Sequence, residues 1–483
     1  MSADLREFLE RIAASGWLTH VFSVASFLLA LFLIARLMSE KRAPANTFAW
    51  LLAIILVPYI GVPLYLLFGG RKLRRLMERK SRVLPTLPVA PAQPSMYINA
   101  PVAHTIISSG APPPVAGNSV RFLTNGEETY RAIEQQIREA EHYIHIATFI
   151  LARDDTGKRL VKLLAEKARR GVKVRLLLDA VGCLFSSRGF VDPIRAAGGE
   201  VGRFMPVLPI ITSRGSANLR NHRKIAVFDC CTAIVGGHNL AREYIGPTSL
   251  KKRWQDFGAL IQGPAAALLN EVFIADWCFT TRQNADILHR EIAPGAAEPR
   301  GTGELQVVAS GPDVPGDPLY EGIVSMIQEA NDSIWIITPY FIPDDVLLRS
   351  LIVKARAGKE VTLILPASSN HPITDLARKH YLRLLANAGA RVLLFGPGML
   401  HSKAVIVDDR LGLLGSANFD LRSLFVNFEI GVLVHSQPEV VAMKAWAAGL
   451  ATHCKELKPQ RSGKFRLAGS LAEDLSRLLA PLL

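Results

Sequence analysis

Two long apolar stretches open the chain, and shorter apolar runs alternate with polar segments in the rest of it. Residues 17–35 are almost entirely apolar, and residues 47–68 contain no charged side chain. Each stretch has about the 20 residues that a helix needs to cross a bilayer. Because only a short linker separates them, the pattern predicts an N-terminal transmembrane helical hairpin in residues 1–70, with spans at about 17–38 and 47–68.

Two other interpretations of these stretches fit less well. The length and the lack of charge disfavour a pair of buried core helices. A cleaved signal peptide is disfavoured because no clear small-residue cleavage site follows the first stretch and a second one comes directly after it. Pro58, Gly61 and Pro63 lie inside the second stretch, and we expect them to distort its helix.

Basic residues mark one side of the predicted hairpin. Between Arg71 and Arg82 the chain has seven basic residues and one acidic residue. Such an excess is typical of the cytoplasmic side of a membrane span, and each basic side chain near an anionic surface contributes on the order of 1 kcal/mol of attraction. Arg36, Lys41 and Arg42 in the linker weaken this orientation without reversing it. Both ends of the hairpin are therefore expected in the cytoplasm.

The segments that flank the body of the protein have patterns of their own. Residues 71–118 combine the basic cluster with a proline-rich stretch, which predicts a juxtamembrane segment and a linker. Near the C-terminus, leucines on one helical face predict an amphipathic helix: Leu467, Leu471, Leu475, Leu478, Leu479 and Leu482. This helix is expected to pack on the body, and a membrane-surface helix is the alternative.

The body itself shows an internal repeat of its apolar runs. The strand-like residues 143–149 resemble residues 333–341, and each run follows an amphipathic, helix-like stretch. Gly171 and Gly358 each separate the end of a predicted helix from the next strand. Strands that alternate with helices indicate two α/β domains, which we place as follows: residues 119–290 and residues 300–483.

The composition limits the partners and the compartment. Lysine plus arginine exceeds aspartate plus glutamate by 14, and 49% of the residues are hydrophobic. The positive balance favours anionic partners, either nucleic acid or an anionic membrane surface. The five cysteines are odd in number and form no Cys-x-x-Cys pair. They therefore argue against a disulfide framework or a zinc site and favour a reducing compartment.

Two copies of one polar motif, His-x-Lys-x-x-x-x-Asp, carry the candidate chemistry. Each copy is followed, 17 residues after its histidine, by an asparagine in a turn of small residues. The two sets are His222, Lys224, Asp229 and Asn239, and His401, Lys403, Asp408 and Asn418. A single His-x-Lys arises often by chance. A duplication that preserved only the fold would let the polar positions drift, so their agreement indicates a retained function.

These residue types suit the chemistry of a phosphodiester. A neutral imidazole can attack phosphorus to give a phosphohistidine, and a protonated imidazole can protonate the departing oxygen. Each lysine shares a strand face with its histidine and can stabilise charge on the phosphoryl oxygens. Asn239 and Asn418 can add hydrogen-bond donors for substrate binding. Asp229 and Asp408 complete the motif at the strand ends, where we expect them to brace the turn. The basic groups make a metal ion unnecessary, and no cofactor is expected.

The paired motif resembles the signature of the phospholipase D superfamily. Three longer stretches, residues 219–225, 415–423 and 427–430, resemble bacterial cardiolipin synthases, and this resemblance covers almost the whole chain. It implies an α/β fold of two duplicated phospholipase D-like domains packed face to face, with both motifs at the seam where the domains meet. The transmembrane helical hairpin precedes these domains at the N-terminus. It also implies a multi-pass protein of the bacterial inner membrane with cytoplasmic catalytic domains.

The resemblance assigns further roles. By family analogy His222 is the nucleophile and His401 the general acid and then the base, while the sequence alone leaves this order open. Each imidazole needs its far nitrogen held so that the other can react. The resemblance suggests Asp256 and Glu429 for this role.

The implied reaction joins two phosphatidylglycerol molecules into cardiolipin and glycerol through a covalent phosphohistidine. The expected partners are these lipids in an anionic membrane, and not nucleic acid. The alternatives are a membrane-bound phospholipase D that releases phosphatidic acid, a nuclease of the superfamily, and a scaffold with relic motifs. The hairpin argues against the nuclease, and the two intact motifs argue against the scaffold. The motifs do not separate transfer from hydrolysis, and they leave the oligomeric state open.

Overall fold

The computed structural model describes residues 95–459 apart from 185–188, 206–218, 291–297 and 315. In the N-terminal region it describes the following residues: 20, 21, 23, 24, 27–29, 31, 32, 34, 35 and 44–62. The chain divides into two compact units, Met1–Lys72 and Leu73–Leu483. The basic cluster after the hairpin and the predicted C-terminal amphipathic helix lie outside the described residues.

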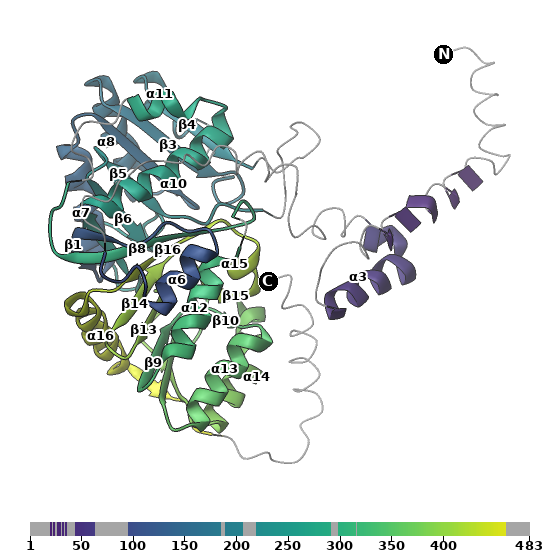
Figure 1. Cartoon of the computed structure of the whole chain (residues 1–483). Helices are drawn as coiled ribbons and strands as arrows, with labels where there is room; N and C mark the ends of the chain where they lie inside the picture. Colours follow the sequence, from purple (N-terminus) through teal and green to yellow (C-terminus); the bar gives the residue numbers. More distant parts are fainter. Residues whose placement is uncertain are drawn as a thin grey trace, which may run out of the picture. The chain divides into compact units, whose positions relative to one another are not determined.

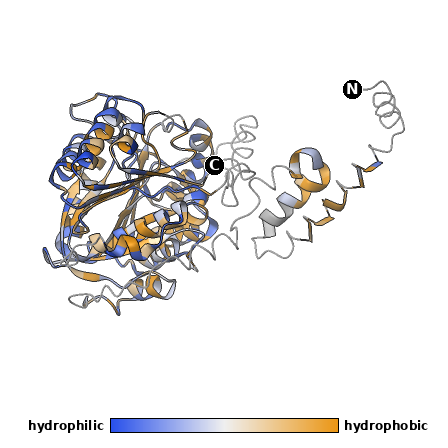
Figure 2. Cartoon of the chain, turned by 90° about the horizontal axis from the view of Figure 1, so that it is seen from above, coloured by the Kyte–Doolittle hydropathy of each residue, from blue (hydrophilic) through white to orange (hydrophobic). Residues whose placement is uncertain are grey.

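The N-terminal unit contains helix α3 (Pro44–Leu56), and helical residues resume at 58–62. The break falls at Val57, directly before Pro58. Proline lacks an amide donor and disfavours a helical conformation in the residue before it, so the distortion expected from Pro58 is present. Hydrophobic residues lie along these helical segments (Figure 2), and many of their side chains, such as that of Leu52, are exposed.

The predicted membrane spans are only partly described. Residues 17–38 and 47–68 both extend beyond the residues that the structure describes. Among the described residues, no helix combines the length and the apolar character that a bilayer crossing requires.

The body begins with α6 (Pro101–Ser108) and continues into a first half that alternates strands and helices (Figure 1). Its elements are β1 (Val115–Leu123), α7 (Gly126–Glu139), β2 (Tyr143–Thr148), α8 (Asp155–Arg169), β3 (Lys173–Asp179), α9 (Asp192–Ala196), β4 (Glu200–Phe204), β5 (Ile225–Phe228), β6 (Thr232–Gly236), β7 (Gly258–Gln262), α10 (Pro264–Thr281) and α11 (Ala285–Arg290). The region expected as a linker is therefore folded in its last part, where α6 packs its apolar face against the body.

The second half repeats the same order with short additions. Its elements are β8 (Gly303–Ser310), α12 (Pro318–Glu329), β9 (Ser333–Ile337), β10 (Phe341–Ile342), α13 (Asp345–Arg356), β11 (Glu360–Pro366), α14 (Pro372–Asn387), β12 (Arg391–Phe395), β13 (Ala404–Val407), β14 (Leu411–Gly415), β15 (Phe419–Asp420), α15 (Leu421–Phe425), β16 (Glu429–Val434), α16 (Gln437–Ala451) and β17 (Cys454–Glu456).

Local chemistry explains where several of these elements begin and end. Asn125, Asp154 and Asp344 cap α7, α8 and α13, and each side chain accepts a hydrogen bond from a backbone N–H in the first helical turn. Gly171 and Gly358 follow α8 and α13 with φ of 92° and 80°. This left-handed conformation costs glycine little and ends a helix, so the predicted glycine stops are confirmed.

Among the described residues, fifteen strands form one sheet that crosses both halves, with the order β17-β12-β11-β9-β13-β14-β16-β8-β1-β7-β6-β5-β2-β3-β4, and β10 and β15 form a separate, parallel two-stranded sheet. In the large sheet β2, β3 and β4 are parallel, as are β9, β11 and β12, and the other neighbours are antiparallel. The halves join edge to edge where β1 pairs with β8. The structure thus has the duplicated α/β halves that the sequence predicted.

The cores show how the halves also meet through their interiors. One cluster of buried side chains lies under the helices of the first half and another under those of the second. A third cluster draws on both halves, and in it Phe257 stacks on Trp446 with ring centroids 3.8 Å apart. The sequence-based expectation was contact between faces, and the edge joint at β1 and β8 was not part of it.

Candidate active site

The two histidine motifs start the equivalent strands β5 and β13. The backbone N–H of His222 donates to the carbonyl of Phe428 at 2.9 Å, and that of His401 donates to the carbonyl of Gln255 at 2.7 Å. In both cases the donor lies in one half and the acceptor in the other. The seam between the halves is therefore built by the segments that carry the motifs.

Each imidazole is also held by an acid that comes from the opposite half. Nδ1 of His222 lies 2.9 Å from Oε1 of Glu429, and Nδ1 of His401 lies 2.6 Å from Oδ2 of Asp256. The hydroxyl of Ser416 donates to the second oxygen of Glu429. An N–H that donates to a carboxylate fixes the tautomer of the ring, so Nε2 is the acceptor nitrogen of each histidine. In His401 this nitrogen lies 3.1 Å from Nζ of Lys403.

The motif lysines are buried beside the histidines. Nζ of Lys224 donates to the backbone carbonyl of His222 at 2.8 Å, and Nζ of Lys403 donates to that of His401. Burial lowers the pKa of Lys224 to about 7 and that of Lys403 to about 8, although the charge of Glu429 opposes both shifts. Removal from water disfavours the charged form, and an anion bound between the lysines would favour it again.

Both imidazoles are biased toward the neutral form. Burial lowers the pKa of His222, against the opposing charge of Glu429. Burial lowers the pKa of His401 well below its usual value, and the charges of Lys403, Lys224 and His222 lower it further. A neutral imidazole is the form that can attack phosphorus.

Glu429 keeps its negative charge in this setting. Burial alone would raise its pKa, but the charge and hydrogen bond of His222, helped by Lys224 and Ser416, hold the pKa below its usual range. The side chain is fully buried. A buried carboxylate that remains ionised stabilises positive charge on the imidazole that donates to it.

Aromatic rings pack against each histidine. The ring of Phe149 meets His222 edge-on at 5.0 Å, and the rings of Tyr244 and Trp254 lie 5.0 and 5.4 Å from His401. These contacts restrict the motion of both imidazoles. The side chain of His222 is 12% exposed and that of His401 is 5% exposed, so His222 is the more accessible of the two.

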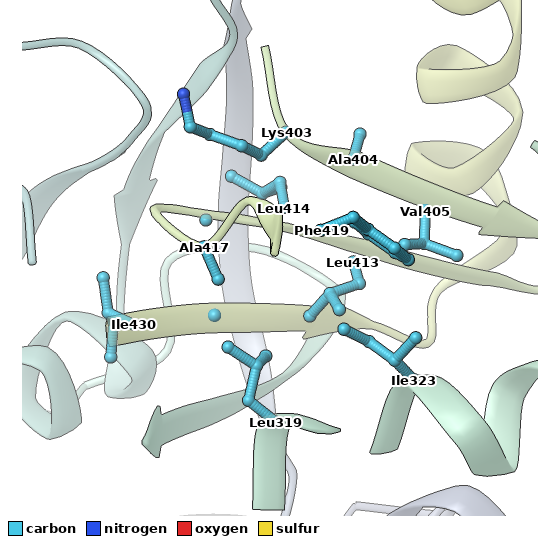
Figure 3. Close-up of a pocket in the computed structure, with 12 residues that line it drawn as sticks. Leu319, Ile323, Lys403, Ala404, Val405, Leu413, Leu414, Ala417, Phe419 and Ile430 are labelled. Carbon is cyan, nitrogen blue, oxygen red and sulfur yellow. The ribbon is translucent and has the colours of Figure 1, made fainter. Parts of the chain in front are cut away.

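Apolar pockets lie under the motif lysines. Figure 3 shows one of them, lined by Leu319, Leu413 and Ile430, with the nitrogen of Lys403 pointing away from these apolar side chains. An equivalent pocket beside Lys224 occurs in the first half. Each lysine thus covers apolar surface with its stem while its ammonium group reaches the backbone of the motif.

The motif aspartates lie at the far ends of the same strands. The carboxylate of Asp229 accepts three backbone N–H bonds of 2.8–2.9 Å, from residues 141, 142 and 143. Asp408 accepts the equivalent bonds from residues 331, 332 and 333. Six residues, four of them in strand β5 or β13, separate each aspartate from its histidine, which is roughly 20 Å of extended chain. The structure therefore places Asp229 and Asp408 where they hold the start of β2 and β9, and does not bring them to the imidazoles.

The two motif asparagines differ in their bonds. Oδ1 of Asn239 accepts the N–H of Ile150 at 3.1 Å, and its amide bonds to Tyr244. Asn418 bonds to Asp420. Its Oδ1 has no hydrogen-bond partner within the part of the chain that the structure describes. The two asparagines are therefore not chemically equivalent.

Arg223 is a site residue whose role the sequence did not indicate. It is 2% exposed, and its Nη1 lies 2.7 Å from the carboxylate of Asp276. It also donates to the carbonyl of Glu429 at 3.0 Å and to that of Ser310 at 3.1 Å, both in the other half. Arg223 thus fixes the backbone of the acid that holds His222. The only signal in the sequence was that the same motif position holds Ser402 in the second copy.

The protein has duplicated α/β halves, and a histidine of each half is hydrogen-bonded to an acid of the other half, with a lysine beside each histidine. This arrangement defines a phospholipase D-like protein. The comparisons agree. Residues 133–277 and 323–450 match the family described as "Cardiolipin synthase, PLD-like domain", and residues 26–70 match the family described as "Phospholipase_D-nuclease N-terminal". The chain belongs to the cardiolipin synthase family.

Similar proteins extend over nearly the whole chain. The cardiolipin synthase of Geobacillus kaustophilus (strain HTA426) is 33% identical, and the match covers 97% of this chain and 95% of the relative. The cardiolipin synthase of Alkalihalophilus pseudofirmus is 32% identical, with 99% and 96% covered. Among solved structures, the phosphatidylserine synthase of Haemophilus influenzae Rd KW20 has a TM-score of 0.60 at 16% identity. That match covers 79% of this chain and 100% of the other, and it shows a shared fold.

Proposed function

We propose that this protein is a cardiolipin synthase that transfers a phosphatidyl group from one phosphatidylglycerol to a second, releasing glycerol. The observation that carries the proposal is the crossed arrangement of His222 with Glu429 and His401 with Asp256. Two imidazoles, each with Nδ1 held by a carboxylate, leave two Nε2 atoms to act on one phosphorus. The family membership supplies the substrate class.

In the first step, Nε2 of His222 attacks the phosphorus of the donor lipid. The bond between phosphorus and the headgroup glycerol breaks, and the departing oxygen takes a proton from His401. A phosphatidyl group remains on His222. His222 takes the role of nucleophile because it is the more accessible of the two. Glu429 stabilises the positive charge that the ring gains on attack.

The acid role of His401 requires a proton that its surroundings disfavour. Burial and the lysine charges lower its pKa well below the usual value. The anionic phosphodiester would lie between Lys224 and Lys403 and offset their charge, which raises the pKa of His401. Substrate binding and protonation of His401 are therefore coupled.

In the second step, neutral His401 takes the proton of a primary hydroxyl on the second phosphatidylglycerol. The oxygen of that hydroxyl forms a bond to phosphorus, the bond between phosphorus and His222 breaks, and cardiolipin leaves. Water could attack in place of the lipid alcohol and would give phosphatidic acid. Transfer requires a site that favours a lipid alcohol over water.

The proposed site of action is the membrane surface, with the N-terminal region as a multi-pass anchor and the catalytic halves, residues 119–290 and 300–483, in the cytoplasm of a bacterium. Support comes from the apolar residues 17–35 and 47–68, the exposed apolar side chains of the described helices, and the net positive charge of the chain. Substrates in an anionic bilayer would then reach the site by lateral diffusion.

One assay tests the proposal. Purified protein in mixed micelles is given phosphatidylglycerol, and the products are separated. Cardiolipin with an equal amount of glycerol supports synthesis, and phosphatidic acid supports hydrolysis. His222→Ala and His401→Ala should each abolish turnover while near-UV circular dichroism stays native. Full activity in either variant would contradict the two-histidine mechanism.

A further inference from the structure

The first half places an apolar loop beside its motif asparagine. Leu151 pairs with Leu240, which sets Ile150 next to Asn239. The N–H of Ile150 donates to Oδ1 of Asn239 at 3.1 Å, so the acceptor of this amide is already used. The neighbouring Phe149 ring packs on His222. This side of the seam offers mainly apolar groups.

The second half builds the equivalent place with polar groups. Phe341 of β10 pairs with Phe419 of β15, and the same register sets Tyr340 next to Asn418. The hydroxyl of Thr338 fixes both strands, because it donates to the carbonyl of Tyr340 at 2.9 Å and accepts the N–H of Phe419 at 3.2 Å. Tyr340 thus occupies the position that Ile150 has in the first half.

A polar cluster extends outward from Tyr340. Its hydroxyl donates to Oδ1 of Asn370 at 2.5 Å, and its ring meets that of His371 edge-on at 5.3 Å. Asn370 and His371 are exposed, while Tyr340 is partly buried. The Tyr340 oxygen keeps a lone pair that can accept a hydrogen bond, and the Asn370 amide keeps its donors.

Asn418 contributes a buried acceptor that the protein itself does not satisfy. The residue is 6% exposed, and its amide donates to Asp420, which orients Oδ1 away from that carboxylate. Across the described ranges, no donor reaches Oδ1. A buried carbonyl without a donor is costly, so it calls for a ligand that carries a proton to donate. The oxygens of a phosphodiester anion carry none, whereas an alcohol does.

This cluster lies on the side of the general base. The turn that carries Asn418 is next to the motif of the same half, because Lys403, Ala417 and Phe419 line one pocket (Figure 3). His371 is also among the charges that lower the pKa of His401. A group held by Tyr340 and Asn418 would therefore be close to the imidazole that removes its proton.

We propose that Tyr340, Asn370 and Asn418 form the binding site for the acceptor alcohol, and that they recognise a 1,2-diol. This rests on the proposed function. The secondary hydroxyl of the incoming phosphatidylglycerol headgroup donates to Oδ1 of Asn418. The oxygen of the same hydroxyl accepts a hydrogen bond from the amide of Asn370, which the hydroxyl of Tyr340 orients. The adjacent primary hydroxyl then gives its proton to His401 and bonds to phosphorus as the bond to His222 breaks. Water lacks the second hydroxyl and is not held in this way.

The test uses two small alcohols that compete for the same phosphatidyl-His222 intermediate, so each turnover gives one of two products. The full-length enzyme in mixed micelles receives short-chain phosphatidylglycerol with equal concentrations of 1,2-propanediol and 1,3-propanediol. Mass spectrometry after chromatography gives the product ratio, corrected for the two primary hydroxyls of the 1,3-isomer. The wild type should favour the 1,2-diol. Asn418→Leu and Tyr340→Phe should each lower the ratio about tenfold, the effect of one lost hydrogen bond.

Two further variants keep the proposal testable. Asn370 is exposed, so Asn370→Ala should fold even if the other variants do not, and it should also lower the ratio. Ile150→Val changes the equivalent first-half position and should retain the wild-type ratio. Wild-type ratios in all the second-half variants, or a wild type with no preference for the 1,2-diol, would overturn the proposal. Failure of the wild type to make cardiolipin from phosphatidylglycerol would instead refute the proposed function, independently of these ratios.

Discussion

Replacing Glu429 with glutamine removes the negative charge beside His222, although the two residues are 207 positions apart and belong to different halves. The bond between Nδ1 of His222 and the carboxylate is 2.9 Å long and charge-assisted. Hydrogen bonds to charged groups contribute about 1.5–3 kcal/mol, which corresponds to roughly 10- to 150-fold in rate. We therefore expect Glu429→Gln to slow formation of the phosphatidyl-enzyme by this factor.

Asp256 holds the other histidine, so we expect Asp256→Asn to change the kinetics in a different way. Asp256 holds His401, so this variant impairs protonation of the leaving group in the first step and removal of the acceptor's proton in the second. A donor lipid with a p-nitrophenol leaving group needs no proton to depart. With this donor the first step should recover in Asp256→Asn and should stay slow in Glu429→Gln.

Rapid-quench trapping of radiolabelled enzyme measures the first step directly, as the burst of p-nitrophenol does. Glu456→Gln, an exposed position on β17, is the matched control and should behave like the wild type. If the activated donor rescued Glu429→Gln and not Asp256→Asn, the roles of the two histidines would be reversed. If both variants responded alike to the activated donor, the different roles inferred from the pairing of each histidine with its acid would be wrong.

Three further predictions follow from buried contacts. Arg223→Met removes the positive charge beside the buried Asp276 carboxylate, which keeps the hydrogen bond from Asn221. This change should lower the free energy of unfolding by about 3–5 kcal/mol, seen as a lower thermal midpoint in detergent. An unchanged midpoint would contradict this. Gly237→Ala would place its Cβ 2.1 Å from Oδ1 of Asp256, so the acid should shift and kcat should fall roughly 100-fold. Gly449→Ala is the control, because its added Cβ would have no described atom outside its own helix within 4 Å. Burial lowers the pKa of His238 to about 4, below the unfolded value near 6.5. The unfolded chain therefore binds the extra proton, and stability should hold above about pH 6.5 and fall by roughly 2 kcal/mol for this group by pH 5. His238→Gln should flatten that part of a denaturation series measured against pH, and a slope equal to that of the wild type would refute the assignment.

Much of the architecture was readable from local patterns. The repeat of apolar runs predicted duplicated α/β halves, and Gly171 and Gly358 predicted where α8 and α13 stop. Pro58 predicted the break after α3. These features depend on hydrophobic period and backbone conformation, which are decided within a few residues of chain.

Other features depend on contacts that no local rule specifies. The burial of Arg223 against Asp276 and the Glu429 backbone could not be read from a motif position that holds serine in the other copy. The motif asparagines are identical in sequence, yet only the tertiary structure shows that Oδ1 is satisfied in Asn239 and not in Asn418. In the first half the neighbouring segment supplies the N–H of Ile150 to this oxygen.

The sequence by itself predicted the candidate groups, which are two imidazoles and two lysines at matching offsets, and the family resemblance suggested Asp256 and Glu429 as the acids. Only the tertiary structure decided how these groups are paired. The edge joint of β1 with β8 and the backbone bonds at the seam bring each histidine to the acid of the opposite half. Residue spacing describes neighbours along one strand or helix, whereas a pair that spans two domains depends on how those domains dock.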